Sequence, residues 1–129
     1  MKNIFFITLI FSTTLLIGQT RVSKDQVTTS KNGLQYYNSK PFTGIVVVKH
    51  KNGKIWKEVT CQDGKVQGLT KVYYQSGKLS FEQEIQNGQY VYIKKWYENG
   101  KLMSEQHYKK GKVNLYKEWD ETGNLIKEE

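Results

Sequence analysis

The sequence has 129 residues, of which 37% are hydrophobic, 13% aromatic and 25% charged. This length allows one small domain and argues against a large enclosed active-site cavity, while the aromatic content argues against a disordered chain. The formal net charge of +8 is compatible with nucleic acid, an anionic lipid surface or an acidic protein as a partner.

Residues 1–18 differ in composition from the rest of the chain. A basic start is followed by an apolar run from Ile4 to Ile17 and then by Gly18. The run is shorter than the roughly 20 residues that a membrane-spanning helix needs. This pattern predicts a secretory signal peptide that is cleaved near Gly18–Gln19. The alternative is an uncleaved N-terminal anchor.

Residues 19–31 are rich in Ser, Thr and Lys and show no sustained periodicity. We interpret them as a polar linker leading into a repeat domain at residues 32–129. The chain has a single cysteine, Cys61, which cannot form an internal disulfide. We predict that Cys61 is a small buried hydrophobic residue. It lies far from the predicted cleavage position, which disfavours a lipoprotein.

Two series of glycine turns recur through the rest of the chain. The first series recurs every 23 or 24 residues, at Asn52-Gly53, Ser76-Gly77, Asn99-Gly100 and Thr122-Gly123. The second follows it by 11 residues, at Asp63-Gly64, Asn87-Gly88 and Lys110-Gly111. Glycine, with Asn or Asp before it, tolerates the positive φ of tight hairpin turns. The pattern therefore predicts an all-β fold, an open twisted antiparallel meander of tandem hairpin repeats of about 23 residues.

Alignment of the repeats on the first turn gives columns of similar residues. One column holds Ile55, Leu79, Leu102 and Leu125. A second holds Glu58, Glu82, Glu105 and Glu128, and a third holds Cys61, Ile85 and Tyr108. Plain strand alternation places the first and third columns on one face and the glutamates on the other. Cross-strand ion pairs with nearby lysines explain the glutamates better than a Ca²⁺ site or an acid–base pair.

Aromatic residues gather in the second strand of each repeat, in two adjacent columns. These columns hold Lys49, Tyr73, Trp96 and Trp119, and His50, Tyr74, Tyr97 and Asp120. A single-layer sheet leaves such side chains partly uncovered, and exposed aromatic groups commonly mark a binding surface. We therefore predict binding residues at Tyr73, Tyr74, Trp96, Tyr97 and Trp119.

The segment from Lys71 to Leu79, echoed from Lys95 to Glu105, resembles the MORN-repeat variant family of bacterial proteins, whose members are often labelled antitoxin components of toxin–antitoxin modules. The resemblance covers Gly44 to Glu129 and rests on the pattern Y-Y-x-x-G-K-L-x-x-E. It implies a hairpin-repeat fold and a role in binding, and it transfers no catalytic residue. The family's second glycine is present only at Gly44 and Gly68. The later repeats carry Val91 and Asn114 there, each after a turn shortened by one residue, so we expect altered turn geometry in them.

The sequence offers little support for chemistry. The two histidines, His50 and His107, stand alone in different columns, and no zinc, redox or phosphate-binding motif is present. We predict no enzyme, no catalytic residue, no metal site and no cofactor. The leading hypothesis is a protein-interaction module, exported to the periplasm or cell surface and antitoxin- or immunity-like, with another protein such as a toxin as its partner. The alternative is a protein that binds envelope glycans or anionic lipids. Export disfavours nucleic acid.

Overall fold

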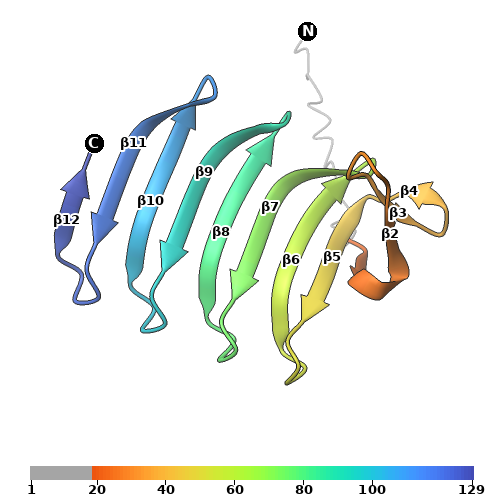
Figure 1. Ribbon diagram of the computed structural model, residues 1–129, viewed down its shortest axis with the longest axis horizontal. Coiled ribbons are helices and arrows are strands. Elements are labelled where there is room, and N and C mark those ends of the chain that lie inside the picture. The colour runs from red at the N-terminus through yellow and green to blue at the C-terminus, as the bar shows by residue number, and fades with distance from the viewer. Residues whose placement is uncertain (1–18) are drawn as a thin grey trace, which may run out of the picture.

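The computed structural model describes residues 19–129. The predicted signal peptide at residues 1–18 lies outside the described residues. Most of the described chain is β-strand, in one sheet of nine strands and one of three (Figure 1). In this part of the chain, no helix is long and apolar enough to span a membrane.

The large sheet is an antiparallel meander (Figure 1), and one further strand pairs parallel to its N-terminal edge. Eight strands follow each other in chain order: β5 (Gly44–Lys49), β6 (Ile55–Gln62), β7 (Lys65–Tyr73), β8 (Leu79–Gln86), β9 (Gln89–Trp96), β10 (Leu102–Lys109), β11 (Lys112–Trp119) and β12 (Leu125–Glu128). Strand β1 (Arg21–Ser23) pairs parallel to β5. The sheet is open, with β1 and β12 at its edges. The predicted fold class is therefore confirmed.

The two glycine series form two kinds of turn. In the second series both central residues have positive φ, for example Asp63 at 50° and Gly64 at 81°, which defines two-residue type I′ turns. In the first series a three-residue loop ends in a left-handed glycine; in the first repeat the amide of Gly53 donates to the carbonyl of His50. The altered turn geometry expected in later repeats is absent, because Lys110 at 51° and Gly111 at 73° match the earlier turns.

The shortening of the later repeats falls in the strand after the turn. In β7, residues 67–69 lie opposite the single residue Thr60 of β6, so β7 has two extra residues at this point. Gly68 supplies a φ of +88° in this segment. In β9 and β11 a single extra residue, Val91 or Asn114, occupies the corresponding place. Removing one residue thus converts a bulge with two extra residues into a bulge with one extra residue, which needs no glycine.

A second bulge decides which side chains share a face. Val48 lies opposite Lys57 and Lys49 opposite Ile55, which leaves Trp56 as an extra residue in β6. The same extra place is held by Ser80, Met103 and Ile126 in later repeats. One extra residue reverses the alternation of side chains along a strand. The Ile/Leu column therefore shares a face with the glutamates, and Cys61 and Ile85 lie on the other face, so the assignment from plain alternation was wrong.

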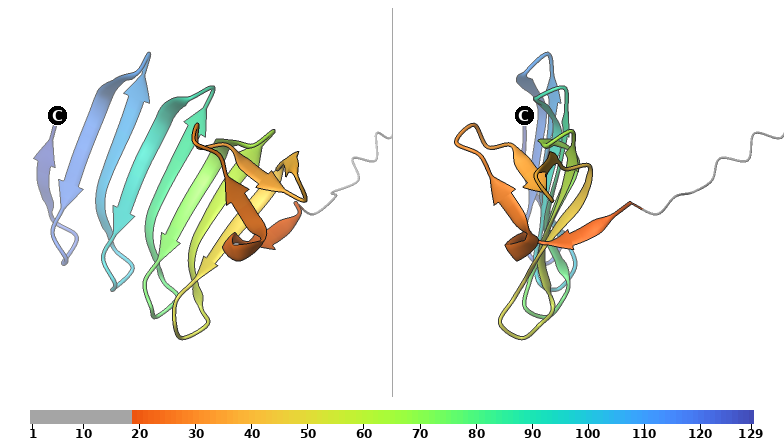
Figure 2. Two further views of the ribbon diagram at one scale, coloured as in Figure 1. Left: turned by 45° about the vertical axis from the view of Figure 1, so that its right-hand side comes forward. Right: turned by 90° about the vertical axis from the view of Figure 1, so that its right-hand side faces the viewer.

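A small sheet stands on one face of the large sheet near its N-terminal edge (Figure 2). It consists of β2 (Val27–Thr29), β3 (Gln35–Tyr37) and β4 (Lys40–Pro41), and a 3₁₀ turn (Lys24–Gln26) joins it to β1. The buried cluster beneath it holds Val22, Val27, Phe42, Val46 and Cys61. We call this side of the large sheet the capped face and the opposite side the charged face.

The structure corrects the interpretation of residues 19–31 as a linker. This segment contributes strand β1 to the large sheet and strand β2 to the small one. Its two valines, Val22 and Val27, are the buried residues in an otherwise polar stretch, and two residues are too few to produce a periodic pattern. Cys61 is buried as predicted, and burial raises the pKa of its thiol.

Candidate interaction surface

The charged face carries a row of alternating charges that runs across seven strands. Each member lies directly opposite the next in the register, in the order Glu58, Lys71, Glu82, Lys94, Glu105, Lys117 and Glu128. Lys71 Nζ lies 3.6 Å from Glu82 Oε2, and Lys117 Nζ lies 3.0 Å from Glu128 Oε1. The lysine ion pairs predicted for the glutamate column are confirmed at Glu82 and Glu128. Within residues 19–129, no three His, Cys, Asp or Glu side chains are grouped so that they could hold a metal ion.

Glu58 is the most heavily bonded member of this row. It accepts hydrogen bonds from the Arg21 guanidinium and from the Tyr73 hydroxyl, the latter at 2.9 Å. Burial opposes ionisation of Glu58, but these bonds outweigh it and hold the pKa of the carboxyl below its ordinary value of 4.5. Burial and the bond to Glu58 raise the pKa of Tyr73 to about 12.

The depressed pKa of Glu58 predicts a loss of stability in acid. A carboxyl whose pKa falls on folding adds stability above its unfolded pKa, and this contribution disappears as the pH falls through the folded pKa. We expect the unfolding free energy of the wild type to fall more steeply than that of Glu58→Gln below about pH 4.5. Urea unfolding at a series of pH values measures this, and Glu121→Gln, an exposed turn position, controls for net charge. Parallel curves for all three chains would contradict the prediction.

The five predicted binding residues lie together along the ends of the second strands. Tyr73, Trp96 and Trp119 lie opposite Leu79, Leu102 and Leu125 on the charged face. All five side chains are half-buried. We call these five residues the aromatic band. Three of them lie beside the Ile/Leu column, and within residues 19–129 other apolar side chains, such as Trp56 and Ile126, are more exposed.

Tyr74 and Tyr97 link consecutive repeats. The Tyr74 hydroxyl donates to the carbonyl of Trp96 at 2.7 Å, and the Tyr97 hydroxyl donates to the carbonyl of Trp119 at 2.9 Å. In the first repeat, the ring of His50 contacts the carbonyl of Tyr73 in the same way, at 2.9 Å. This column therefore ties each first-series turn to the next, which is a structural role for two residues predicted to bind a partner.

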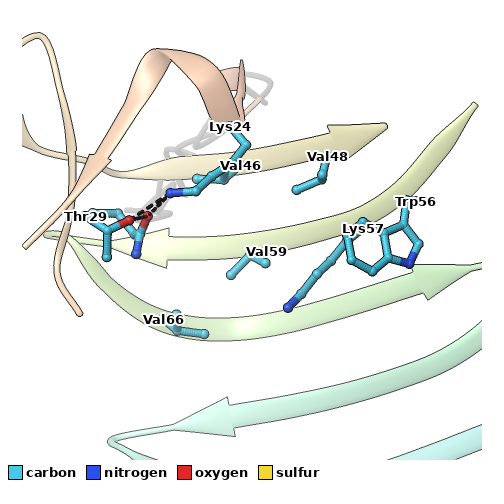
Figure 3. Close-up of a pocket in the computed structure, with 9 residues that line it drawn as sticks. Lys24, Thr29, Val46, Val48, Trp56, Lys57, Val59 and Val66 are labelled. Carbon is cyan, nitrogen blue, oxygen red and sulfur yellow. Dashed lines mark hydrogen bonds between the residues drawn. The ribbon is translucent and has the colours of Figure 1, made fainter. Parts of the chain in front are cut away.

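The capped face contains an open cleft of about 450 Å³ between the small sheet and the exposed part of β6 (Figure 3). Its floor is apolar and is formed by Val46, Val48, Val59 and Val66. Lys24 lies at one end, where its ammonium donates to the side-chain oxygens of Thr29 at 2.7 Å and Gln35 at 3.3 Å. Trp56, which is 45% exposed, lies at the other end, and Lys57 follows it in β6.

Sequence reasoning missed this cleft for two reasons. Trp56 stands at the bulge position, where the other repeats carry Ser80, Met103 and Ile126, so it falls outside every aromatic column. Its isolation in a column without other aromatic residues was the available signal. Lys24 belongs to the segment interpreted as a linker, and only the fold brings it to the valines of β5 and β6.

Comparison with known proteins identifies the repeat. The MORN repeat variant family matches residues 66–87 and 91–110, which span β7–β8 and β9–β10. These two segments are MORN-variant repeats, which confirms the resemblance seen in the sequence. No curated protein and no solved structure matches the chain.

Proposed function

We propose that this chain of MORN-variant repeats is a non-enzymatic protein-interaction module that binds its partner in the cleft on the capped face. The half-exposed indole of Trp56 beside an apolar floor carries the proposal. Exposed aromatic groups next to a concave apolar surface are the usual anchors of protein interfaces. The family match supports a repeat module of the interaction type.

The lining of the cleft defines the chemistry of the partner. The valine floor favours an apolar side chain, which would lose its contact with water there. Lys24 and Lys57 lie at the rim, and no acidic residue lines the cleft. The complementary partner segment therefore carries an apolar anchor flanked by Asp or Glu.

The finer part of the proposal is an antitoxin- or immunity-like role in the cell envelope. The leader at residues 1–18 supports export, and the family resemblance supports inhibition of a toxin by binding. Inhibition of this kind requires only a stable complex and no chemistry. Cell fractionation of the full-length chain tests the location, since recovery in the cytoplasm alone would contradict it.

Removing the indole of Trp56 should weaken the complex. We expect Trp56→Ala to reduce affinity at least tenfold, because an aromatic anchor at an interface commonly contributes 2 kcal/mol or more. The partner is captured with the wild-type chain, identified by mass spectrometry, purified and titrated by calorimetry. Val113→Ala, at an apolar position that is 47% exposed on β11, is the matched control.

A third variant, Trp96→Ala, tests the aromatic band that the sequence predicts as the site. A loss of affinity in Trp96→Ala that is absent in Trp56→Ala would place the partner on the charged face. Circular dichroism of each variant separates lost binding from lost folding, because Trp96 lies beside the Ile/Leu column.

The second candidate is a protein that binds anionic lipid or an acidic envelope glycan. Two lysines and an indole beside an apolar cleft also suit a phosphate or carboxylate head with an apolar or sugar body. Vesicles containing phosphatidylglycerol and purified peptidoglycan are the probes, each titrated with salt. Salt-sensitive binding that is lost in a Lys24→Ala, Lys57→Ala double variant would favour this candidate over a protein partner.

A further inference from the structure

The outer edge of β12 differs from every other edge in the meander. Two short motifs alternate through the large sheet. The first strand of each repeat (β6, β8, β10 and β12) carries Leu or Ile, followed three residues later by Glu. The second strand (β7, β9 and β11) carries a lysine, followed two residues later by an aromatic residue. These segments are Lys71-Val72-Tyr73, Lys94-Lys95-Trp96 and Lys117-Glu118-Trp119. In each pairing the lysine lies opposite the glutamate. The sheet is thus held together by repeated use of one complementary pair of motifs.

Interior glutamates have basic neighbours on both sides. Glu82 lies between Lys71 and Lys94, and Glu105 lies between Lys94 and Lys117. Glu58 has Lys71 on one side, and Arg21 of β1 forms an ion pair with it from the other. The side chains of Glu58, Glu82 and Glu105 are accordingly only 16%, 17% and 21% exposed.

Glu128 has only half of this arrangement. Lys117 lies on its inner side, and among residues 19–129 no strand lies on its outer side. Its side chain is 51% exposed. Two neighbouring apolar residues, Leu125 and Ile126, are 52% and 61% exposed. The glutamate and the leucine of β12 are therefore open, whereas their counterparts in the interior first strands are partly covered.

The backbone of β12 also directs hydrogen-bonding groups towards its outer edge. The amide and carbonyl of Glu129 exchange hydrogen bonds of 2.9 and 2.8 Å with Tyr116 of β11. Because antiparallel strands direct alternate residues to opposite neighbours, the amide and carbonyl of Glu128 point outward. An exposed edge of this kind is a template for strand addition.

We propose that the outer edge of β12 binds an extended segment of a partner protein with the motif Lys or Arg, any residue, then Trp or Tyr. The segment adds antiparallel, with its basic residue opposite Glu128. The pairing of β9 with β8 is the model for this arrangement. There Lys94 lies opposite Glu82, and Trp96, two residues later in β9, lies nearer to the Leu79 end of β8. On β12 the aromatic ring accordingly lies on the charged face and covers Leu125. This edge is separate from the cleft and does not depend on the function proposed for it.

A synthetic peptide with the sequence of residues 90–97, which contains Lys94-Lys95-Trp96, is the probe. We expect saturable binding to the full chain by fluorescence anisotropy, with the amide of Glu128 becoming protected from hydrogen exchange. The Glu128→Lys variant should bind the peptide about tenfold more weakly, because an opposite-charge pair becomes a like-charge pair. Glu121→Lys, which makes the same charge change at an exposed turn position, should bind like the wild type.

A charge swap makes the test specific to the register. A peptide with Glu in place of Lys94 should bind the wild-type chain weakly and the Glu128→Lys variant more tightly. Equal binding of the original peptide to wild type and Glu128→Lys, or absence of saturable binding, would overturn the proposal. Light scattering of the chain without peptide is the remaining test, since stable self-association that protects the amide of Glu128 would assign the edge to a second copy instead.

Discussion

Gly44→Val is expected to lower the unfolding temperature by more than about 10 °C, corresponding to roughly 3 kcal/mol. Gly44 has a φ of +148°, a conformation that β-branched residues avoid. A Cβ atom at this position would lie 2.3 Å from the carbonyl oxygen of Thr20 and 2.6 Å from Cζ of Phe42. The substitution therefore combines backbone strain with displacement of β1 and of the buried Phe42 ring. Thermal unfolding followed by circular dichroism measures the effect.

Gly53→Val separates these two causes. Gly53 also has positive φ, at +83°, but a Cβ atom there has no neighbouring atom within 4 Å. Backbone strain alone should cost about 1–2 kcal/mol at this position. A loss of stability in Gly53→Val as large as in Gly44→Val would show that the close approach of Thr20 and Phe42 contributes nothing.

Phe42→Ala should destabilise the protein by about 3–4 kcal/mol, the usual cost of deleting a buried ring. The Phe42 side chain is 4% exposed, and its ring meets that of Tyr37 edge-on at 5.8 Å between centroids. Its backbone is also fixed, because its amide donates to Gln35 and its carbonyl accepts from Gly64. Phe81→Ala is the matched control, since Phe81 is a half-buried phenylalanine in β8, opposite Val72, and its loss should cost less than half as much. Urea unfolding measures both.

The strands that lose protection in Phe42→Ala are a second measurable outcome, besides the loss of unfolding free energy. In a repeat protein each unit contacts mainly its neighbours, so a local defect loosens nearby strands first. We expect Phe42→Ala to abolish hydrogen-exchange protection in the small sheet, β5 and β6, while β9 to β11 keep theirs. Uniform loss of protection along the whole sheet would contradict a local defect and indicate a single cooperative unit.

The sequence by itself determined the repeat and the order of the strands from β5 to β12. Asn-Gly and Asp-Gly pairs at fixed spacing specify tight turns through local backbone preference alone, so no knowledge of distant contacts was needed. The same holds for the glutamate column, because Glu58, Glu82 and Glu105 recur at the same place after the first-series turn of each repeat. The resemblance to MORN-variant repeats rests on the same local pattern.

Only the tertiary structure decided the faces, the N-terminal cap and the candidate sites. The bulges at Trp56 and Val91 depend on how two strands pair, and each reverses the alternation from which a face would be read. Val22 and Val27 give no periodic signal, and they become core residues because β1 and β2 dock against β5 and the capped face. The cleft beside Trp56 needs Lys24 from that docked segment. The open edge at Glu128 exists because the register places a lysine on one side of it only.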